Sequence, residues 1–474
     1  MRFVRTGRRW PAAAAIIAGV ALLVAAVGAA AAGWRRGAEP PPVSRECDIP
    51  PIGLGKCHIV AMGEAAREVA GGSVRTLQER LRGNPSDAQA WARLGAEYVE
   101  LARSTADPSY YGKAQGALDR SLALLPDGNG AAMLGLGALA NARHDFAAAR
   151  EWAQRAAAVL PDTAEVYGVL ADALTQLGDA DGATAAVQRM LDLRPSVASF
   201  GRASYDLELH GRLDEARTAM ERAMADATTP DEAAFCRYYL GELAFNAGRP
   251  DEAQREYEQG LAVAPGHSAL REGTAKVAAA AGDPQRALQI YRELVAAAPL
   301  PQYLQEYAAL LAATGRAGDA AEQYAVLAQQ QRLAEAAGAT DDLTAALVAA
   351  DRGDAAEALR RASAEWGRRQ HVLVADAMAW ALHLSGRDDE ALQYADRAAA
   401  LGTVDATLAY HRGMILRALG RYSAATDALA AALRINPYFS PVHAPLAAEA
   451  LGQLRSQSPS QSPSQSPSQL RGGR

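Results

Sequence analysis

Between residues 73 and 454 the apolar residues recur at helical spacing, and short stretches rich in glycine or proline interrupt them at regular intervals. The first such segment carries Val74, Leu77 and Leu81 on one face and ends at the tripeptide GNP, at 83–85. Apolar positions three and four residues apart form one stripe of an α-helix, and glycine and proline mark its end. The pattern therefore predicts a chain of short amphipathic helices.

Small residues recur along the same region with a period close to 34 residues. Ten alanines share one register, with spacings of 35, 34, 33, 37, 34, 33, 38, 33 and 34 residues: Ala114, Ala149, Ala183, Ala216, Ala253, Ala287, Ala320, Ala358, Ala391 and Ala425. Eight glycines recur in phase with them: Gly178, Gly211, Gly248, Gly282, Gly315, Gly353, Gly386 and Gly420. The recurring alanine marks the point where two paired helices cross closely, and the glycine supplies the left-handed turn between them. The pattern predicts helical hairpins that stack in series.

The stretch from Trp91 to Tyr98, WARLGAEY, resembles the first half of the tetratricopeptide repeat (TPR) signature W-x2-L-G-x2-Y. The resemblance implies an all-α fold, a right-handed α-solenoid of about ten TPR helix-turn-helix units that occupies residues 73–454. Segments such as SFGRASYDLELHGRLDEARTAMERA and RYYLGELAFNAGRPDEA are similar to a group of bacterial TPR proteins with an N-terminal signal or anchor. That similarity implies export of the repeat region and no particular activity.

Two segments depart from the regular repeat. Ala114 follows Trp91 seven positions later than the TPR signature requires, and Pro108 excludes one straight helix through the inserted residues. The segment QQQRLAEAAGATDD, at 329–342, is predicted to lengthen one helix and to shift the unit that follows.

The N-terminus, residues 1–36, is predicted to be a signal-anchor or transmembrane segment. Four arginines precede an uncharged run at 11–33, and two arginines follow it directly. The run is long enough to span a bilayer as a helix. The excess of arginine before it predicts a single pass through a bacterial cytoplasmic membrane, with the body of the protein outside. Small residues at 28–32 also fit a cleavage site, so secretion after cleavage is the alternative.

Residues 37–72 form a predicted Pro/Gly-rich linker that contains two cysteines. Cys47 and Cys57 lie ten positions apart, and in an oxidising compartment a disulfide between them would close a small loop. Two free thiols in a linker are the alternative. At the other end of the chain, the Ser/Gln/Pro repeat at 455–474 has a composition that predicts disorder.

Charge and motifs narrow the range of functions. The net charge is −6, and acidic residues are interspersed among the basic ones, so we expect no continuous phosphate-binding stripe and no nucleic-acid partner. The eight histidines are scattered, and no pair has the i, i+4 spacing of a helical zinc site. A nucleophile elbow is absent and a phosphate loop is incomplete. We therefore expect no catalytic residue, no cofactor and no metal site.

The TPR resemblance places positions two, five, nine and twelve of each first helix on the concave face of the solenoid. Several of these positions carry aromatic or acidic side chains, which suit a protein or peptide partner that contains arginine or lysine. The groove candidates are Asp172, Tyr205, Glu208, Tyr238, Glu242, Phe245, Trp380 and Tyr410. For the phenylalanines Phe235 and Phe245, ordinary packing between helices is the alternative interpretation.

The sequence therefore favours a non-catalytic scaffold or adaptor that binds a protein or peptide in its concave groove, on the outer face of the membrane. The alternative is an accessory subunit or a glycan-binding module of an envelope enzyme or transport system, in which the aromatic faces stack on sugars. The sequence does not distinguish these two possibilities.

Overall fold

The structure is a computed structural model that describes residues 64–105 and 107–457. These residues form 22 helices and no strand, which confirms the predicted all-α solenoid. The helices are α2 (Glu64–Gly83), α3 (Ala88–Thr105), α4 (Ser109–Leu124), α5 (Gly130–Ala142), α6 (Phe146–Val159), α7 (Ala164–Leu177), α8 (Ala180–Leu193), α9 (Val197–Leu209), α10 (Leu213–Asp226), α11 (Pro230–Asn246), α12 (Pro250–Val263), α13 (Ser268–Ala280), α14 (Pro284–Ala297), α15 (Pro301–Ala313), α16 (Ala317–Ala336), α17 (Asp342–Asp351), α18 (Ala355–Arg368), α19 (Val372–Leu384), α20 (Asp388–Ala398), α21 (Ala406–Ala418), α22 (Tyr422–Ile435) and α23 (His443–Gln457).

Twenty of these helices form ten consecutive hairpins, from α3 with α4 to α21 with α22, which we number as units 1 to 10. In each unit the odd-numbered helix is the first helix and the even-numbered one is the second. We call the chain between them the turn, and the chain to the next unit the linker. Helix α2 packs on α3, and α23 packs on α22, so one extra helix covers each end of the array. Helix α2 begins at Glu64, nine residues before the predicted start of the repeat region.

The alanine register is confirmed, because all ten recurring alanines are 0–3 % exposed and lie in second helices. The eight recurring glycines also have the predicted conformation, with φ between 69° and 82°. Unit 2 has no glycine at this point. His144 takes the left-handed conformation there, with φ of 62°. A residue other than glycine in this region is unusual and costs about 1 kcal/mol, so its surroundings must hold it in place.

Both predicted irregularities are present. Helix α3 is 18 residues long and ends before Pro108, after which α4 begins, and Tyr111 of α4 donates a hydrogen bond to the Ala142 carbonyl at 3.1 Å. Helix α16 is 20 residues long. Its extension reaches the beginning of the array, where Ala334 and Ala339 belong to the same apolar cluster as residues of α2 to α5. The long α16 therefore brings the middle of the chain against its start.

The membrane and linker predictions fall outside the described residues. The segment at 1–36, the cysteines Cys47 and Cys57, and the tail beyond residue 457 are not among them. Within the described residues, none of the helices combines the length and the apolar character that crossing a membrane requires.

Candidate functional site: the inner helix layer and the seam

We call the first helices of the ten units the inner layer. Pairs of charged side chains join the first helices of neighbouring units. Arg202 of α9 is 1 % exposed and forms a bidentate pair with Asp172 of α7, at 2.8 Å from Nε to Oδ1 and 2.6 Å from Nη2 to Oδ2. Two parallel N–H···O bonds of this kind are among the strongest that a protein side chain makes. The groove candidate Asp172 is thus held inside the inner layer by the next unit.

A second and larger polar group joins units 5, 6 and 7. Lys276 of α13 donates to both carboxylate oxygens of Glu242, at 2.6 and 2.7 Å, and lies 2.8 Å from Oε1 of Glu272. The hydroxyl of Tyr257 also donates to Glu242, at 2.6 Å. The ammonium group of Lys276 lies over the ring of Phe245, 5.6 Å from its centre. One lysine thus neutralises carboxyl groups from two consecutive first helices.

Burial shifts the pKa values of this group strongly. Burial raises the pKa of Glu272, and the neighbouring carboxyl of Glu306 raises it further. Burial lowers the pKa of Lys276, but the carboxylates of Glu242, Glu272 and Glu306 outweigh burial and raise it. Because Glu272 is fully buried, its proton is retained more readily than in water. The network thus combines a firmly charged lysine with a carboxyl group that resists ionisation.

A third cluster lies in units 9 and 10. Nδ1 of His411 lies 3.0 and 2.9 Å from the two carboxylate oxygens of Asp376. The ring of Trp380 stacks on His411 with centres 4.2 Å apart, and Tyr410 packs beside them, 5.6 Å from Trp380. Burial, together with the neighbouring His411, lowers the pKa of His443 to about 4. Trp380 and Tyr410, both groove candidates, therefore belong to one packed aromatic cluster.

Six of the eight groove candidates are buried in this structure: Asp172, Tyr238, Glu242, Phe245, Trp380 and Tyr410. Tyr205 and Glu208 are half-buried. Phe235 and Phe245 belong to one apolar cluster that spans units 3 to 6, which agrees with the packing interpretation of these two residues. The role of the groove candidates in binding a partner stays a prediction.

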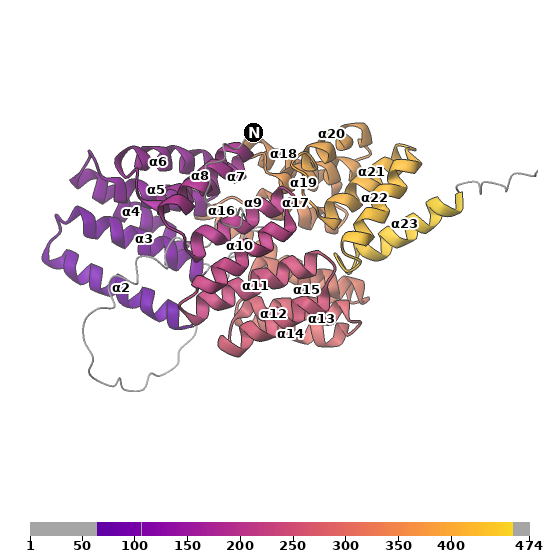
Figure 1. Ribbon diagram of the computed structural model, residues 1–474, viewed down its shortest axis with the longest axis horizontal. Coiled ribbons are helices and arrows are strands. Elements are labelled where there is room, and N and C mark those ends of the chain that lie inside the picture. Colours follow the sequence, from indigo (N-terminus) through magenta and orange to yellow (C-terminus); the bar gives the residue numbers. More distant parts are fainter. Residues whose placement is uncertain (1–63, 106, 458–474) are drawn as a thin grey trace, which may run out of the picture.

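The two halves of the solenoid also meet along one line of contact, which we call the seam (Figure 1). The turns of units 2 to 5 meet the linkers that follow units 7 to 10, one to one. His144 lies beside Thr340, Gly178 beside Gln370, Gly211 beside Gly402, and Gly248 beside Ile435 and Asn436. The pairs are about 190 residues apart, so each turn meets a linker five units further along the chain.

The turns at the seam require glycine for two reasons: φ is positive there, and a β-carbon would collide with the facing linker. A β-carbon on Gly178 would lie 2.7 Å from the Gln370 carbonyl oxygen, and one on Gly248 would lie 2.8 Å from that of Ile435. Gly211 faces the Gly402 carbonyl even more closely. The turn glycines of units 6 to 10, by contrast, have nothing within 4 Å of that position. The two groups share one backbone conformation and differ in what faces them.

Two hydrogen bonds join α9 to the second half of the chain at the seam. The Thr403 hydroxyl donates to the Leu209 carbonyl at 2.5 Å. Nδ1 of His371 accepts from the backbone N–H of Leu373 at 3.2 Å, so Nε2 is the protonated nitrogen and donates to the Tyr205 hydroxyl at 3.1 Å. The groove candidate Tyr205 is thus engaged by the second half of the chain.

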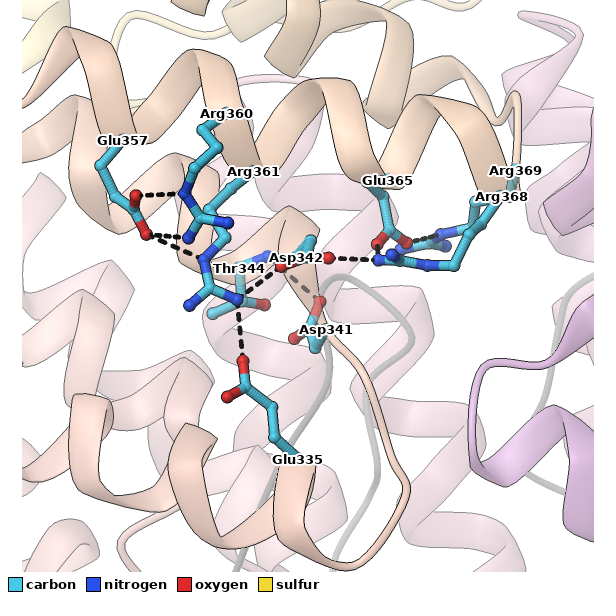
Figure 2. Close-up of polar contacts among 10 residues, drawn as sticks. All are labelled: Glu335, Asp341, Asp342, Thr344, Glu357, Arg360, Arg361, Glu365, Arg368 and Arg369. Carbon is cyan, nitrogen blue, oxygen red and sulfur yellow. Dashed lines mark hydrogen bonds and ion pairs between the residues drawn. The ribbon is translucent and has the colours of Figure 1, made fainter.

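A buried charge network lies next to the seam, along α18 and at its C-terminal end (Figure 2). Arg369 is 3 % exposed, pairs with Glu365, which is 1 % exposed, and also donates to Gln176 of α7. Its guanidinium group lies 5.2 Å from the ring centre of Phe146. Arg369 therefore connects its own helix pair to units 2 and 3 across the seam.

The same network extends along α18 to the neighbouring units (Figure 2). Arg368 and Arg361 both bind Asp342 at the start of α17, each at 2.6 Å, and Arg361 also reaches Glu335 of α16 at 2.8 Å. Burial raises the pKa of Asp341 to about 6, against the hydrogen bonds that Thr344 donates to it. Helices α16, α17 and α18 are thereby fixed to one another where Arg369 crosses the seam.

The seam residues were not found by sequence reasoning. His144 carried one usable signal, because it stands at the turn position that glycine occupies in units 3 to 10, and the Arg368-Arg369 pair carried none. Contacts between residues about 190 positions apart depend on the pitch of the whole solenoid, which a single repeat does not specify.

Comparison with known proteins identifies the repeats. A sequence model described as tetratricopeptide repeat matches residues 203–253 and 238–300, and a second model with the same description matches residues 406–439. No curated protein matches the chain.

Solved structures of repeat proteins are similar in part. A thermophilic TPR protein of Thermus thermophilus is 24% identical, covers 40% of this chain and 98% of its own, with a TM-score of 0.36. A tetratricopeptide repeat protein of Parabacteroides merdae is 18% identical over 53% of this chain and 96% of its own, with a TM-score of 0.33. The human IFIT1 dimer is 14% identical over 78% of this chain and 87% of its own, with a TM-score of 0.44.

Proposed function

The chain is a tetratricopeptide repeat protein, and we propose that it is a non-catalytic scaffold that binds a protein or peptide partner on its inner helix layer. Repeats of this type generally serve as scaffolds for protein–protein interaction. The finer part of the proposal concerns the surface: the partner binds the first helices of units 3 to 6.

The polar character of the inner layer is the observation that carries the proposal. Buried pairs such as Arg202 with Asp172 and Lys276 with Glu242 contribute little net stability, because removing two charges from water costs about as much as their attraction returns. Apolar residues would hold the same helices together as well or better. We infer that these charges serve a state in which the inner layer contacts a partner.

The charges also indicate the chemistry of the partner. Acidic side chains outnumber basic ones around the central group, where Glu242, Glu272 and Glu306 surround the one lysine. Glu208, which is half-buried at the concave position twelve of unit 4, adds a further carboxylate. A partner segment with arginine or lysine between apolar residues complements such a surface.

Selection of peptides tests this proposal. A displayed library of random 12-residue peptides is selected on the purified full chain, and enriched peptides are measured by fluorescence anisotropy. We expect enriched peptides to contain arginine or lysine, and Glu208→Gln to weaken them about threefold to tenfold, since one charge-assisted contact is lost. Glu322→Gln, which removes an exposed carboxylate on the outer helix α16, is the matched control. Enrichment without basic residues, or equal binding by both variants, would contradict the proposal.

We further propose that the scaffold works on the outer side of a bacterial cytoplasmic membrane, anchored by the segment at 1–36 or released after cleavage. The support is the uncharged run at 11–33 with its flanking arginines. A reporter that is active only in the cytoplasm, fused after Leu454, should be inactive. An active reporter would show that the body of the protein lies in the cytoplasm, which would contradict the proposal.

A further inference from the structure

A cavity of about 470 Å³ lies within the seam, between α7, α8 and α9 on one side and α18, α19 and α20 on the other. Its volume falls in the range of sites that hold small organic ligands. Leu209, Val372 and Leu401 provide apolar wall, and Trp366 adds an aromatic ring. Because both halves of the chain contribute, the cavity exists only while the seam is closed.

Arg397 of α20 is the charged group at the edge of this cavity. Its guanidinium group lies 5.6 Å from the ring centre of Trp366 and 5.2 Å from that of Tyr394. Among the described residues no hydrogen bond or ion pair engages Arg397, whereas about half of the arginines there, such as Arg202 and Arg369, have a carboxylate partner. A guanidinium group that is oriented by two rings and lacks a partner is a ready site for a carboxylate or a phosphate.

The opposite wall carries the polar side chains of Asp206 and His210, and both already have hydrogen-bond partners within the protein. Oδ2 of Asp206 accepts from the Thr184 hydroxyl at 2.7 Å, and Nδ1 of His210 donates to the Asp206 carbonyl at 2.7 Å. The imidazole therefore keeps its Nε2 for a ligand. The Asp206 carboxylate forms no ion pair with Arg397, and its second oxygen lies 3.3 Å from Nδ1 of His210.

We propose that the seam cavity binds a small organic anion whose carboxylate or phosphate pairs with Arg397 and whose apolar part fills the space between Trp366 and Leu209. The cavity borders the C-terminal ends of α7 and α9, and its proposed ligand does not depend on the partner proposed above. A ligand that contacts both walls binds the closed molecule in preference to the open one, so it stabilises closure by mass action.

Three probes that share one ring system distinguish the contribution of the ring from that of the anionic group. Naphthalene-2-carboxylate supplies the ring and the anion, naphthalene-2-carboxamide is its neutral analogue, and 2-naphthyl phosphate replaces the carboxylate by phosphate. Each is titrated into the purified full chain by calorimetry. We expect both anions to bind in the millimolar range or tighter and the amide to bind at least about fivefold more weakly, since it cannot form a charge-assisted pair. The stronger of the two anions identifies the preferred head group.

Matched variants locate the site. Arg397→Gln should weaken the anions about tenfold, which corresponds to the loss of one charge-assisted contact. Arg222→Gln, at the same repeat position in unit 4 and also exposed, should leave binding within about twofold. Gly211→Ala, which disturbs the seam beside the cavity, should weaken binding, and Gly315→Ala should not. The proposal is wrong if neither anion binds at about 10 mM, if carboxylate and amide bind equally, or if Arg397→Gln behaves as Arg222→Gln does.

Discussion

Gly211 and Gly402 are 191 positions apart in the chain, yet their backbones touch so closely that a β-carbon on Gly211 would collide with the Gly402 carbonyl oxygen. The contact is one of a series in which the turns of units 2 to 5 meet the linkers after units 7 to 10. A solenoid is usually regarded as a one-dimensional stack in which each repeat contacts its neighbours. This chain adds a second set of contacts, between repeats five units apart.

Alanine substitution of the turn glycines distinguishes the stability that the seam contributes from the stability that the turn conformation contributes. Gly315→Ala should lower the free energy of unfolding by about 1 kcal/mol, because its φ of 79° disfavours a side chain. Gly211→Ala has the same conformational cost and should lose about 1–3 kcal/mol more, because the seam must shift to admit the methyl group.

Urea unfolding measures this difference, and hydrogen exchange shows where it acts. Faster exchange is expected at residues 400–404 in Gly211→Ala and at no seam residue in Gly315→Ala. Equal stability losses with unchanged exchange at 400–404 would mean that the seam is not closed in solution.

The repeat register was predictable because it is local. Ala253 and its nine equivalents are small for the same reason, the close crossing of two helices joined by one turn, and that reason repeats about every 34 residues. The seam was not predictable because small rotations between successive units add up before Gly211 meets Gly402. Groove residues such as Tyr238 were placed on the correct helices, but Tyr238 is buried against Tyr257 of its own unit and Lys276 of the next.

The charge network at α18 should be sensitive to the loss of Arg369. Arg369→Met leaves the Glu365 carboxylate buried with fewer partners, and breaking a buried pair in this way costs about 3–5 kcal/mol. The double variant Arg369→Met with Glu365→Gln should recover part of that loss, since no uncompensated charge remains.

Arg360→Gln is the control for this experiment, because Arg360 lies on the same helix with a side chain 59 % exposed. Its pair with Glu357 should contribute nothing measurable. Chemical unfolding of the four chains decides the matter. A loss for Arg369→Met no larger than that for Arg360→Gln would show that Arg369 does not hold the seam.

Stability should fall as the pH falls from about 6.5 to about 4 because of His267. This residue is 3 % exposed, and its Nδ1 accepts the backbone N–H of Leu270 at the start of α13, at 3.4 Å. Burial lowers its pKa to about 4. Between these two pH values the unfolded chain binds a proton that the folded chain does not, so unfolding is favoured by up to about 3 kcal/mol.

The variant His267→Asn tests that assignment, because asparagine also accepts a hydrogen bond at a helix start and does not titrate. The free energy of unfolding, measured from pH 7 to pH 4, should depend less on pH in the variant than in the natural chain. Identical pH profiles would assign the dependence to other groups.

Lys276 is the last residue for which the structure makes a sharp prediction. It is the one cation among the carboxyl groups of Glu242, Glu272 and Glu306, so Lys276→Met should cost about 3–5 kcal/mol. Combining it with Glu242→Gln should restore much of the loss, because one of the unpaired charges is removed. Lys113→Met, at an exposed position on α4, should change stability by no more than about 0.5 kcal/mol. If the double variant is no more stable than Lys276→Met alone, the lysine acts through packing against Phe245 and not through charge.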